Sequence, residues 1–176
     1  MIKHYFPELD YFLRLETKNE IWHQENPGSL SKKYNSINYE IINGEKIYLF
    51  DLAVDMMENG VFIFKESRYT SVPAHRFIYP EINYIYSGSC DFCIEGKTYT
   101  LNQGDMLILE PDVIHSTSFK SSDDIIVSIA LKDRYFEDII NKSDDNGENI
   151  IFNFFAESRN KARKKNHFFI YRENDE

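Results

Sequence analysis

The sequence predicts a mainly β protein, a β-sandwich or small antiparallel barrel flanked by helices at both ends. Residues 46–131 carry short apolar, aromatic and β-branched runs separated by turn residues, a pattern typical of roughly seven to nine strands. The aromatic content of 15% also favours β-rich structure. On either side of this stretch, apolar residues recur at helical spacing instead.

The expected strands follow one another with recognisable turns between them. Their sequences are KIYLFDLAV, GVFIFKE, EINYIYSG, SCDFCIEGKTYTL, MLILEP, IHSTSF and DIIVSIAL. The residues at 95–97 (EGK) are typical of a hairpin turn, and those at 102–105 (NQGD) form another turn. Gly88 and Gly104 permit turn conformations that other residues resist.

The flanking segments differ from this strand pattern. Residues 7–25 are expected to form one amphipathic helix with Pro7 in its first turn, followed by a polar connector at 26–45 that holds at most one short strand. Two further helices are expected near residues 131–141 and 150–165, and the final apolar run is HFFIY. The predicted parts are an N-terminal arm and connector (1–45), a barrel (46–131) and a C-terminal helical extension (132–176).

The charge of the chain excludes some functions. There are 29 acidic and 20 basic residues, giving a net charge of -9, and an acidic surface repels the phosphates of nucleic acids. The sequence has no basic amphipathic face, no apolar run of about 20 residues and no secretory signal at its start. We therefore expect a soluble cytoplasmic protein that does not bind membranes and does not itself bind DNA.

The two cysteines, Cys90 and Cys93, form a CxxC pattern. A structural zinc site usually needs four ligands, and the sequence offers no second cysteine pair. The segment is expected to be a strand, in which residues three apart point to opposite faces. We interpret both thiols as structural, with neither a shared metal nor a disulfide.

Two polar residues near position 80 require a chain reversal to act together. On one straight strand, His75 and Glu81 would lie about 20 Å apart. Pro80 is poorly tolerated inside a strand, so a reversal over residues 78–80 is expected. His75, Phe77 and Glu81 would then face the same interior. His115, four residues after the strand-ending Pro111, is a further candidate downstream.

These residues resemble the two motifs of the cupin barrels. In metal-binding cupins, the first motif has two histidines around one residue, then a glutamate and a glycine; the second has a glycine, a proline and a histidine. His75, Glu81 and His115 match three of the four metal ligands, and Phe77 replaces the second histidine. The second motif also lacks the usual glycine after its proline and is one residue shorter. The resemblance implies a double-stranded β-helix.

Residues 46–172 more closely resemble the N-terminal effector-binding cupin of AraC-type bacterial transcription regulators, on the pattern "HRFIYPEINYIYSG", "GD" and "PDVIHS". The resemblance implies a small-molecule sensor without enzymatic activity or cofactor, with a sugar among the candidate effectors. The implied effector-binding residues are His75, Phe77, Tyr79, Glu81 and His115. It also implies a homodimer that binds DNA through a C-terminal module, which would follow this chain together with the dimerisation helices.

Two other interpretations stay open. If a divalent metal binds, its ligands are His75, Glu81 and His115, the two-histidine, one-carboxylate set of non-haem iron enzymes. The chain would then be a stand-alone metal-dependent cupin enzyme. Alternatively, the three residues are only hydrogen-bonded polar groups at strand ends, with Glu81 paired to Arg76 or a lysine.

Overall fold

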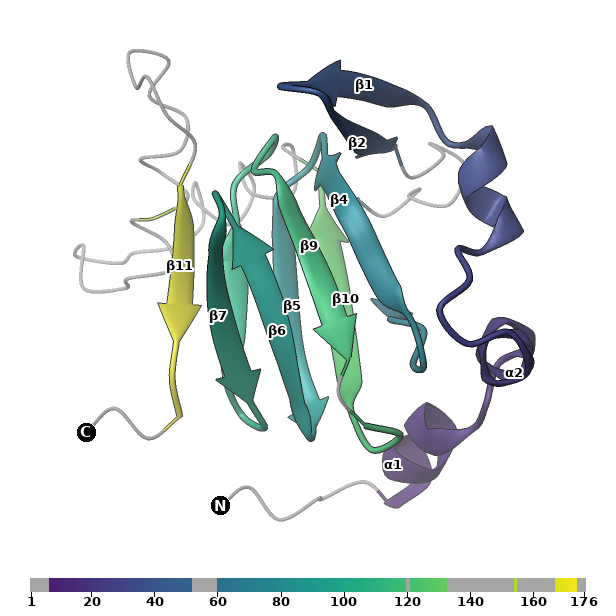
Figure 1. Cartoon of the computed structure of the whole chain (residues 1–176). Coiled ribbons are helices and arrows are strands. Elements are labelled where there is room, and N and C mark those ends of the chain that lie inside the picture. The colour runs from purple at the N-terminus through teal and green to yellow at the C-terminus, as the bar shows by residue number, and fades with distance from the viewer. Residues whose placement is uncertain (1–6, 52–59, 120, 133–153, 155–166, 174–176) are drawn as a thin grey trace, which may run out of the picture.

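The computed structural model describes residues 7–51, 60–119, 121–132, 154 and 167–173, which form two facing β-sheets with helices at the N-terminal end (Figure 1). The six-stranded sheet has the order β1-β2-β4-β9-β6-β7, and the five-stranded sheet has the order β11-β8-β5-β10-β3. The strands of the first sheet are β1 (Tyr39–Ile42), β2 (Glu45–Phe50), β4 (Ser71–Phe77), β6 (Ser89–Ile94), β7 (Lys97–Asn102) and β9 (His115–Phe119). Those of the second are β3 (Val61–Lys65), β5 (Glu81–Ser87), β8 (Met106–Leu109), β10 (Ile125–Leu131) and β11 (Phe168–Tyr171).

The main core lies between the two sheets. Inward positions alternate with outward ones along β5 and β6, as expected for strands with one face in a core. Fully buried apolar side chains from both sheets join one cluster. Its buried members are Ile85, Cys90, Phe92, Ile94, Leu101, Leu107, Leu109, Val113 and Ile126. The predicted mainly β, cupin-like fold is confirmed.

The predicted turns are found where the sequence placed them. Glu95 and Gly96 link β6 to β7 with φ values of 51° and 76°, which are typical of a two-residue hairpin turn. Gly88 has φ 73°, and a Cβ at this position would collide with Asp124 of the neighbouring loop. Any residue larger than glycine at position 88 would therefore have to displace the backbone of that loop.

The N-terminal helix prediction is wrong in one respect, since residues 7–25 form two helices. The helices are α1 (Pro7–Arg14) and α2 (Lys18–Glu25). Thr17 caps the second helix: its hydroxyl accepts a hydrogen bond from the Glu20 backbone N–H, and the Glu20 carboxylate accepts one from the Thr17 backbone N–H. This capping box starts a new helix and so ends the first one. A 3₁₀ helix, η1 (Lys32–Ser36), follows in the connector.

One strand pair also differs from the expected antiparallel pattern. Strand β2 pairs with β4 in parallel, with Tyr48 opposite His75 and Phe50 opposite Phe77. The connection between these two strands includes β3, which lies in the opposite sheet. Because the chain crosses to the other sheet and returns, β4 can run in the same direction as β2.

Within its described residues, the C-terminal extension contains a strand that the sequence did not predict. The apolar run at its end forms β11, which pairs with β8 and so adds an outer strand to the five-stranded sheet. The two predicted C-terminal helices and the basic run within the second lie outside the described residues, apart from Phe154. The division into 1–45, 46–131 and 132–176 stays a prediction. Among the helices that are described, none has the length and apolar character needed to cross a membrane.

The cysteines lie as predicted. Cys90 and Cys93 are both free thiols on β6; Cys90 is buried in the core and Cys93 is partly exposed on the opposite face. Burial raises the pKa of the Cys90 thiol to about 12. Cys90 is therefore expected to be chemically inert, whereas Cys93 is accessible to reagents.

Candidate functional site

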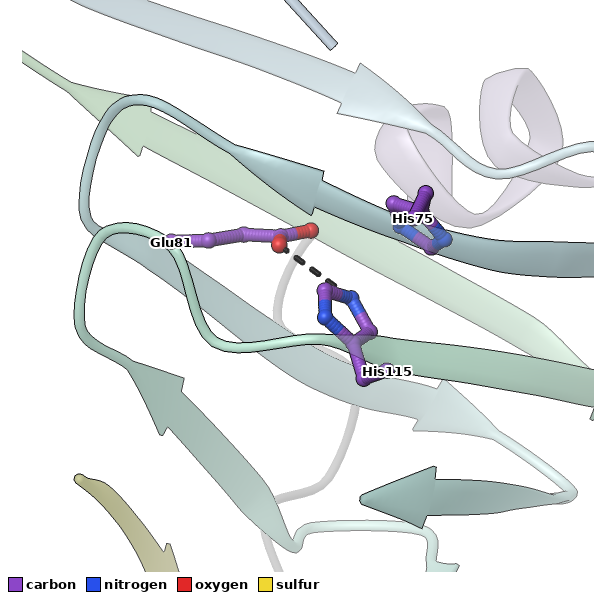
Figure 2. A group of neighbouring side chains, drawn as sticks. All are labelled: His75, Glu81 and His115. Carbon is purple, nitrogen blue, oxygen red and sulfur yellow. Dashed lines mark ion pairs between the residues drawn. The ribbon is translucent and has the colours of Figure 1, made fainter. Parts of the chain in front are cut away.

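The chain reverses at Pro80 as the sequence predicts, and this reversal brings the polar residues together. Strand β4 ends at Phe77 and β5 begins at Glu81, so both strand ends face the same interior. His75 on β4 is the register partner of His115 at the start of β9. Glu81 reaches them from the opposite sheet (Figure 2).

His75, Glu81 and His115, here called the inner cluster, are in direct proximity. The Nε2 atom of His115 lies 3.4 Å from Oε2 of Glu81, and the two imidazole centroids are 4.1 Å apart. One candidate ligand atom from each of the three residues lies within 4.8 Å of the others. All three side chains are at most 3% exposed, so water contributes little to their solvation.

Backbone carbonyls fix the orientation of both imidazoles. The Nδ1 atom of His75 lies 2.8 Å from the Pro73 carbonyl, and Nδ1 of His115 lies 3.1 Å from the Val113 carbonyl. A carbonyl accepts only, so each Nδ1 carries the proton and donates it. Each Nε2 is left with a free lone pair, the form in which histidine binds a metal or accepts a hydrogen bond.

The inner cluster carries no charge near pH 7. Burial raises the pKa of Glu81 to about 8, and the nearby Glu66 carboxylate adds to this shift. Burial lowers the pKa of His115 to about 4 and that of His75 well below its ordinary value, to which the neighbouring His115 also contributes. A protonated carboxylic acid therefore faces two neutral imidazoles.

Several polar atoms of this interior have no hydrogen-bond partner. They are Oε2 of Glu81, Nδ2 of Asn83 and Oγ1 of Thr117, each in a side chain at most 6% exposed. Asn83 follows Glu81 on the inward face of β5, and Thr117 follows His115 on that of β9. Buried polar atoms are nearly always paired, so three unpaired ones on neighbouring inward positions indicate a site built for a polar occupant or an ion.

The two predicted aromatic residues have different positions. Phe77 is 4% exposed, and its ring centroid lies 5.7 Å from that of His75, beside the inner cluster. Tyr79 lies in the turn between β4 and β5, and its hydroxyl donates to Asp51 at 3.3 Å. The geometry thus groups Phe77 with the histidines and places the hydroxyl of Tyr79 beside a different residue.

A cavity of ≈ 570 Å³, here called the mouth cavity, opens next to the inner cluster. It lies between η1 and strands β2, β3 and β4. Phe50 and Phe77 line it, and the Phe50 ring contacts that of His75 at a tilt of 31° with centroids 4.5 Å apart, so these two rings separate the cavity from the cluster. Its other polar and aromatic lining residues include Lys33, Tyr34, Asp51, Phe64, Lys65 and Glu66.

The sequence did not indicate these further lining residues. Tyr34 and Phe77 are far apart in the chain and meet only because η1 folds over the end of the sheets. No local pattern marks such a contact. The aromatic composition was the only available signal, and it does not distinguish a cavity wall from a core.

A second depression, the outer cleft, has a volume of ≈ 590 Å³ and opens beside the β1–β2 and β6–β7 hairpin turns. Its lining residues include Cys93, Glu45, Ile114 and, from the inner cluster, His115. Nearby, Arg76 pairs with Glu40 and Asp112, at 3.1 and 2.7 Å. The alternative in which Arg76 pairs with Glu81 is therefore wrong.

Comparison with known families identifies one match. Residues 59–127 match the model of the AraC-like ligand binding domain. The matched stretch contains His75, Phe77, Glu81 and His115, together with the strands that carry them. It confirms, over these residues, the resemblance that the sequence motifs indicate. No significant match was found among curated protein sequences.

Similar solved structures include ToxT and a cupin-domain protein. The chain is 15% identical to unsaturated fatty acid-bound ToxT from Vibrio cholerae, with a TM-score of 0.44, covering 63% of this chain and 39% of ToxT. A cupin-2 domain containing protein from Shewanella frigidimarina is 13% identical, with a TM-score of 0.35 and coverage of 68% and 96%. KdgF from Halomonas sp. is 18% identical, with a TM-score of 0.36 and coverage of 47% and 87%. The chain thus spans about two fifths of the length of ToxT.

Proposed function

We propose, from the premise that residues 59–127 form an AraC-like ligand-binding domain, that this chain senses a small-molecule effector for a bacterial transcription regulator. The effector occupies the mouth cavity, and the inner cluster lies behind Phe50 and Phe77, the two rings that separate it from the cavity. DNA binding and dimerisation belong to the same proposal and would be performed by segments beyond this sequence. The effector class extends from sugars and organic acids to amphiphiles such as the fatty acid in the ToxT structure.

One observation carries this proposal: an aromatic-lined cavity lies beside a buried polar cluster, and part of the hydrogen-bonding capacity around that cluster is not used. Aromatic walls supply apolar or stacking contact, and a few converging polar groups fix the orientation of a ligand. The volume of ≈ 570 Å³ lies within the range of small-molecule sites. The unpaired atoms on Glu81, Asn83 and Thr117 are suited to hydroxyl or carbonyl groups.

The effector site can be tested with a panel of sugars, organic acids and fatty acids, using thermal shift to find a ligand and calorimetry to measure its affinity. We expect Phe50→Ala, on the wall of the mouth cavity, to weaken the ligand at least tenfold, about 1.4 kcal/mol. Ile114→Ala, on the wall of the outer cleft, is the matched control and should have no effect. The opposite result would place the ligand in the outer cleft and contradict the proposal.

The regulatory context has a simpler test. An immunoblot of the source cell with antibody to this domain should show a protein larger than the 20.9 kDa of this sequence by about one further domain. A band at 20.9 kDa would contradict control of transcription through an attached DNA-binding module.

A metal-dependent cupin enzyme is the second candidate, and the inner cluster favours it specifically. The residues fit a divalent cation because two imidazoles present free Nε2 lone pairs and Glu81 has an unpaired carboxyl oxygen. His75, Glu81 and His115 would hold the metal, which would serve as a Lewis acid or an oxygen-activating centre. Binding would require Glu81 to lose its proton, so metal affinity should rise with pH towards about 8.

Restoring the histidine of the cupin pattern should create a stronger metal site. In Phe77→His, three imidazoles and one carboxylate would line the interior, and we expect the Kd for Zn²⁺ or Mn²⁺ to fall at least tenfold, about 1.4 kcal/mol. Calorimetry on untagged protein, prepared without chelator or nickel resin, measures this. Phe64→His adds an imidazole elsewhere on the cavity wall and should leave the affinity unchanged. Equal affinities in all three proteins would argue against metal binding at the inner cluster.

A further inference from the structure

Aromatic side chains form a continuous part of the wall of the mouth cavity. They are Tyr34, Phe50, Phe77 and Phe64. Along this series the ring centroids lie 6.1, 5.2 and 6.4 Å apart, so each ring adjoins the next. Such a wall binds apolar groups, and it also attracts cations, because the face of an aromatic ring is electronegative. The rings alone therefore do not select one class of ligand.

One cation of the chain already lies over this wall. The Nζ atom of Lys33 is 5.4 Å from the centroid of the Tyr34 ring, within the range of a cation–π interaction. Lys33 is exposed and Tyr34 is buried, so this ammonium group lies at the rim of the cavity that both residues line. The aromatic wall thus accommodates positive charge at its entrance.

A carboxyl group of the cavity lining has no strong partner. Among the described residues, the one side-chain contact of Glu66 is with the Ser128 hydroxyl, at 3.4 Å. That hydroxyl has a single proton, and it lies closer to the side-chain oxygen of Asn83, at 2.7 Å. Glu66 is therefore left without a short hydrogen bond and without a cation in contact.

The basic residues of the lining do not neutralise Glu66. Lys65 Nζ donates to the carboxylate of Glu20 at 2.9 Å and to two backbone carbonyls, so its charge is already used. Lys33 acts only from the rim: burial raises the pKa of Glu66 above its ordinary value, although Lys33 and the Ser128 hydroxyl oppose that shift. Because Asp51 also lines the cavity, carboxyl groups outnumber uncommitted ammonium groups there.

We propose that the effector of the mouth cavity is an organic cation, an amine or quaternary ammonium compound with an apolar body, whose charge pairs with Glu66 while its body lies against the aromatic wall. This inference rests on the proposed function of the cavity. The cation supplies the charge partner that Glu66 lacks, and the neighbouring rings add cation–π attraction that is strongest when the cation is desolvated. A neutral sugar leaves Glu66 unpaired, and an organic anion is repelled by Glu66 and Asp51.

Probes of one shape and different charge test this class. Phenethylamine is a cation at neutral pH, phenethyl alcohol is uncharged and hydrocinnamate is an anion, and each carries one phenyl ring. NMR titration at constant ionic strength should give phenethylamine a Kd at least tenfold below that of phenethyl alcohol, and hydrocinnamate the highest Kd. Choline and its uncharged carbon isostere, dimethylbutanol, repeat the comparison for a quaternary ammonium group.

Substitutions then locate the charge partner. Glu66→Gln keeps the shape of the side chain and should weaken phenethylamine at least tenfold while leaving phenethyl alcohol unchanged. Lys33→Met removes a competing ammonium group and should strengthen phenethylamine about threefold, whereas it would weaken an anionic effector. Glu45→Gln makes the same change as Glu66→Gln on the wall of the outer cleft and is the matched control, without effect on either probe.

The outcomes separate this inference from the proposed function. The cation class is overturned if an uncharged or anionic probe binds as tightly as phenethylamine, if Glu66→Gln does not weaken phenethylamine, or if neither cation binds at millimolar concentration. An uncharged or anionic probe that still loses affinity in Phe50→Ala leaves the mouth cavity as the effector site. If phenethylamine responds to Ile114→Ala and Glu45→Gln instead, it occupies the outer cleft, and the proposed function falls together with the inference.

Discussion

Glu20→Gln is expected to lower the free energy of opening of α1 and α2 by about 3 kcal/mol, because two cations would lose the buried carboxylate that pairs with both of them. Lys65 and Arg68 are 11% and 6% exposed at their side chains, so water cannot replace the lost charge in the docked state. Hydrogen exchange measured by mass spectrometry should show residues 18–25 exchanging about 100-fold faster at pH 7.

The pKa of Glu20 predicts the direction in which helix docking changes with pH. Burial favours the protonated form of Glu20, but hydrogen bonds from Arg68, the Thr17 backbone and Lys65 outweigh it and lower its pKa to about 2. A lowered pKa contributes stability above the ordinary value of 4.5, and this contribution is lost as the pH falls towards 2. Helix docking should therefore weaken with acid over that window in the wild type but not in Glu20→Gln.

An exposed ion pair on α1 is the control. Arg14 and Asp10 form an (i, i+4) pair at 3.0 Å with side chains 39% and 30% exposed. The Tyr86 hydroxyl on β5 also donates to Asp10 at 3.2 Å, a hydrogen bond that the amide oxygen of asparagine can still accept, so Asp10→Asn should change docking by only about 0.5 kcal/mol. If Glu20→Gln has no larger effect than Asp10→Asn, the buried carboxylate does not hold the helices.

The inner cluster was predictable because its signals are local. Pro80 marks a chain reversal, and the period of two along a strand then decides which side chains share a face. His75 and Glu81 could be placed in one interior on this basis alone. The addition of His115 depended on the order and spacing of residues known from cupins, since nothing local relates it to β4.

For the N-terminal helices, the sequence contained a signal for the break between α1 and α2 that was overlooked, and no signal for the ion pair that attaches α2. The break between α1 and α2 was readable, because Thr17 and Glu20 have the spacing of a capping box, and the amphipathic pattern across residues 7–25 obscured it. The attachment of Glu20 to Arg68 was not readable. These residues are 48 positions apart, and in a chain with many charges no pattern selects one ion pair over another.

Glu81→Gln is expected to stabilise the protein, in contrast to most substitutions of buried polar residues. The pKa of Glu81 is raised from 4.5 to about 8, so the unfolded chain releases a proton at pH 7 that the native protein retains. The free energy of unfolding of the wild type therefore falls by about 1.4 kcal/mol for each pH unit above 4.5. Glutamine cannot ionise and avoids this loss. We expect the unfolding free energy at pH 7 to rise by about 3 kcal/mol, as measured by urea denaturation.

The pH profile separates this effect from that of the histidines. The lowered pKa of His115 makes stability increase with pH between about 4 and 6.5, which opposes the loss from Glu81 over part of that range. Above pH 6.5 the histidines no longer contribute, and the loss comes from Glu81 together with Glu66, whose pKa is also raised by burial. Between pH 6.5 and 8 the wild type should lose about 2 kcal/mol that Glu81→Gln retains, whereas Glu45→Gln, at an exposed position, should follow the wild type.

A stabilised Glu81→Gln would mean that the chain keeps a destabilising acid in its interior, which is the usual consequence of a functional site. If the inner cluster binds a metal, the same variant should lose any stabilisation of the wild type by Zn²⁺ or Mn²⁺, because an amide is a much weaker ligand than a carboxylate. If Glu81→Gln is instead less stable at pH 7 and pH 8, the carboxyl group is held by interactions that favour its charge. Glu81 would in that case be a structural residue, and the His75 and His115 lone pairs alone would not make a metal site.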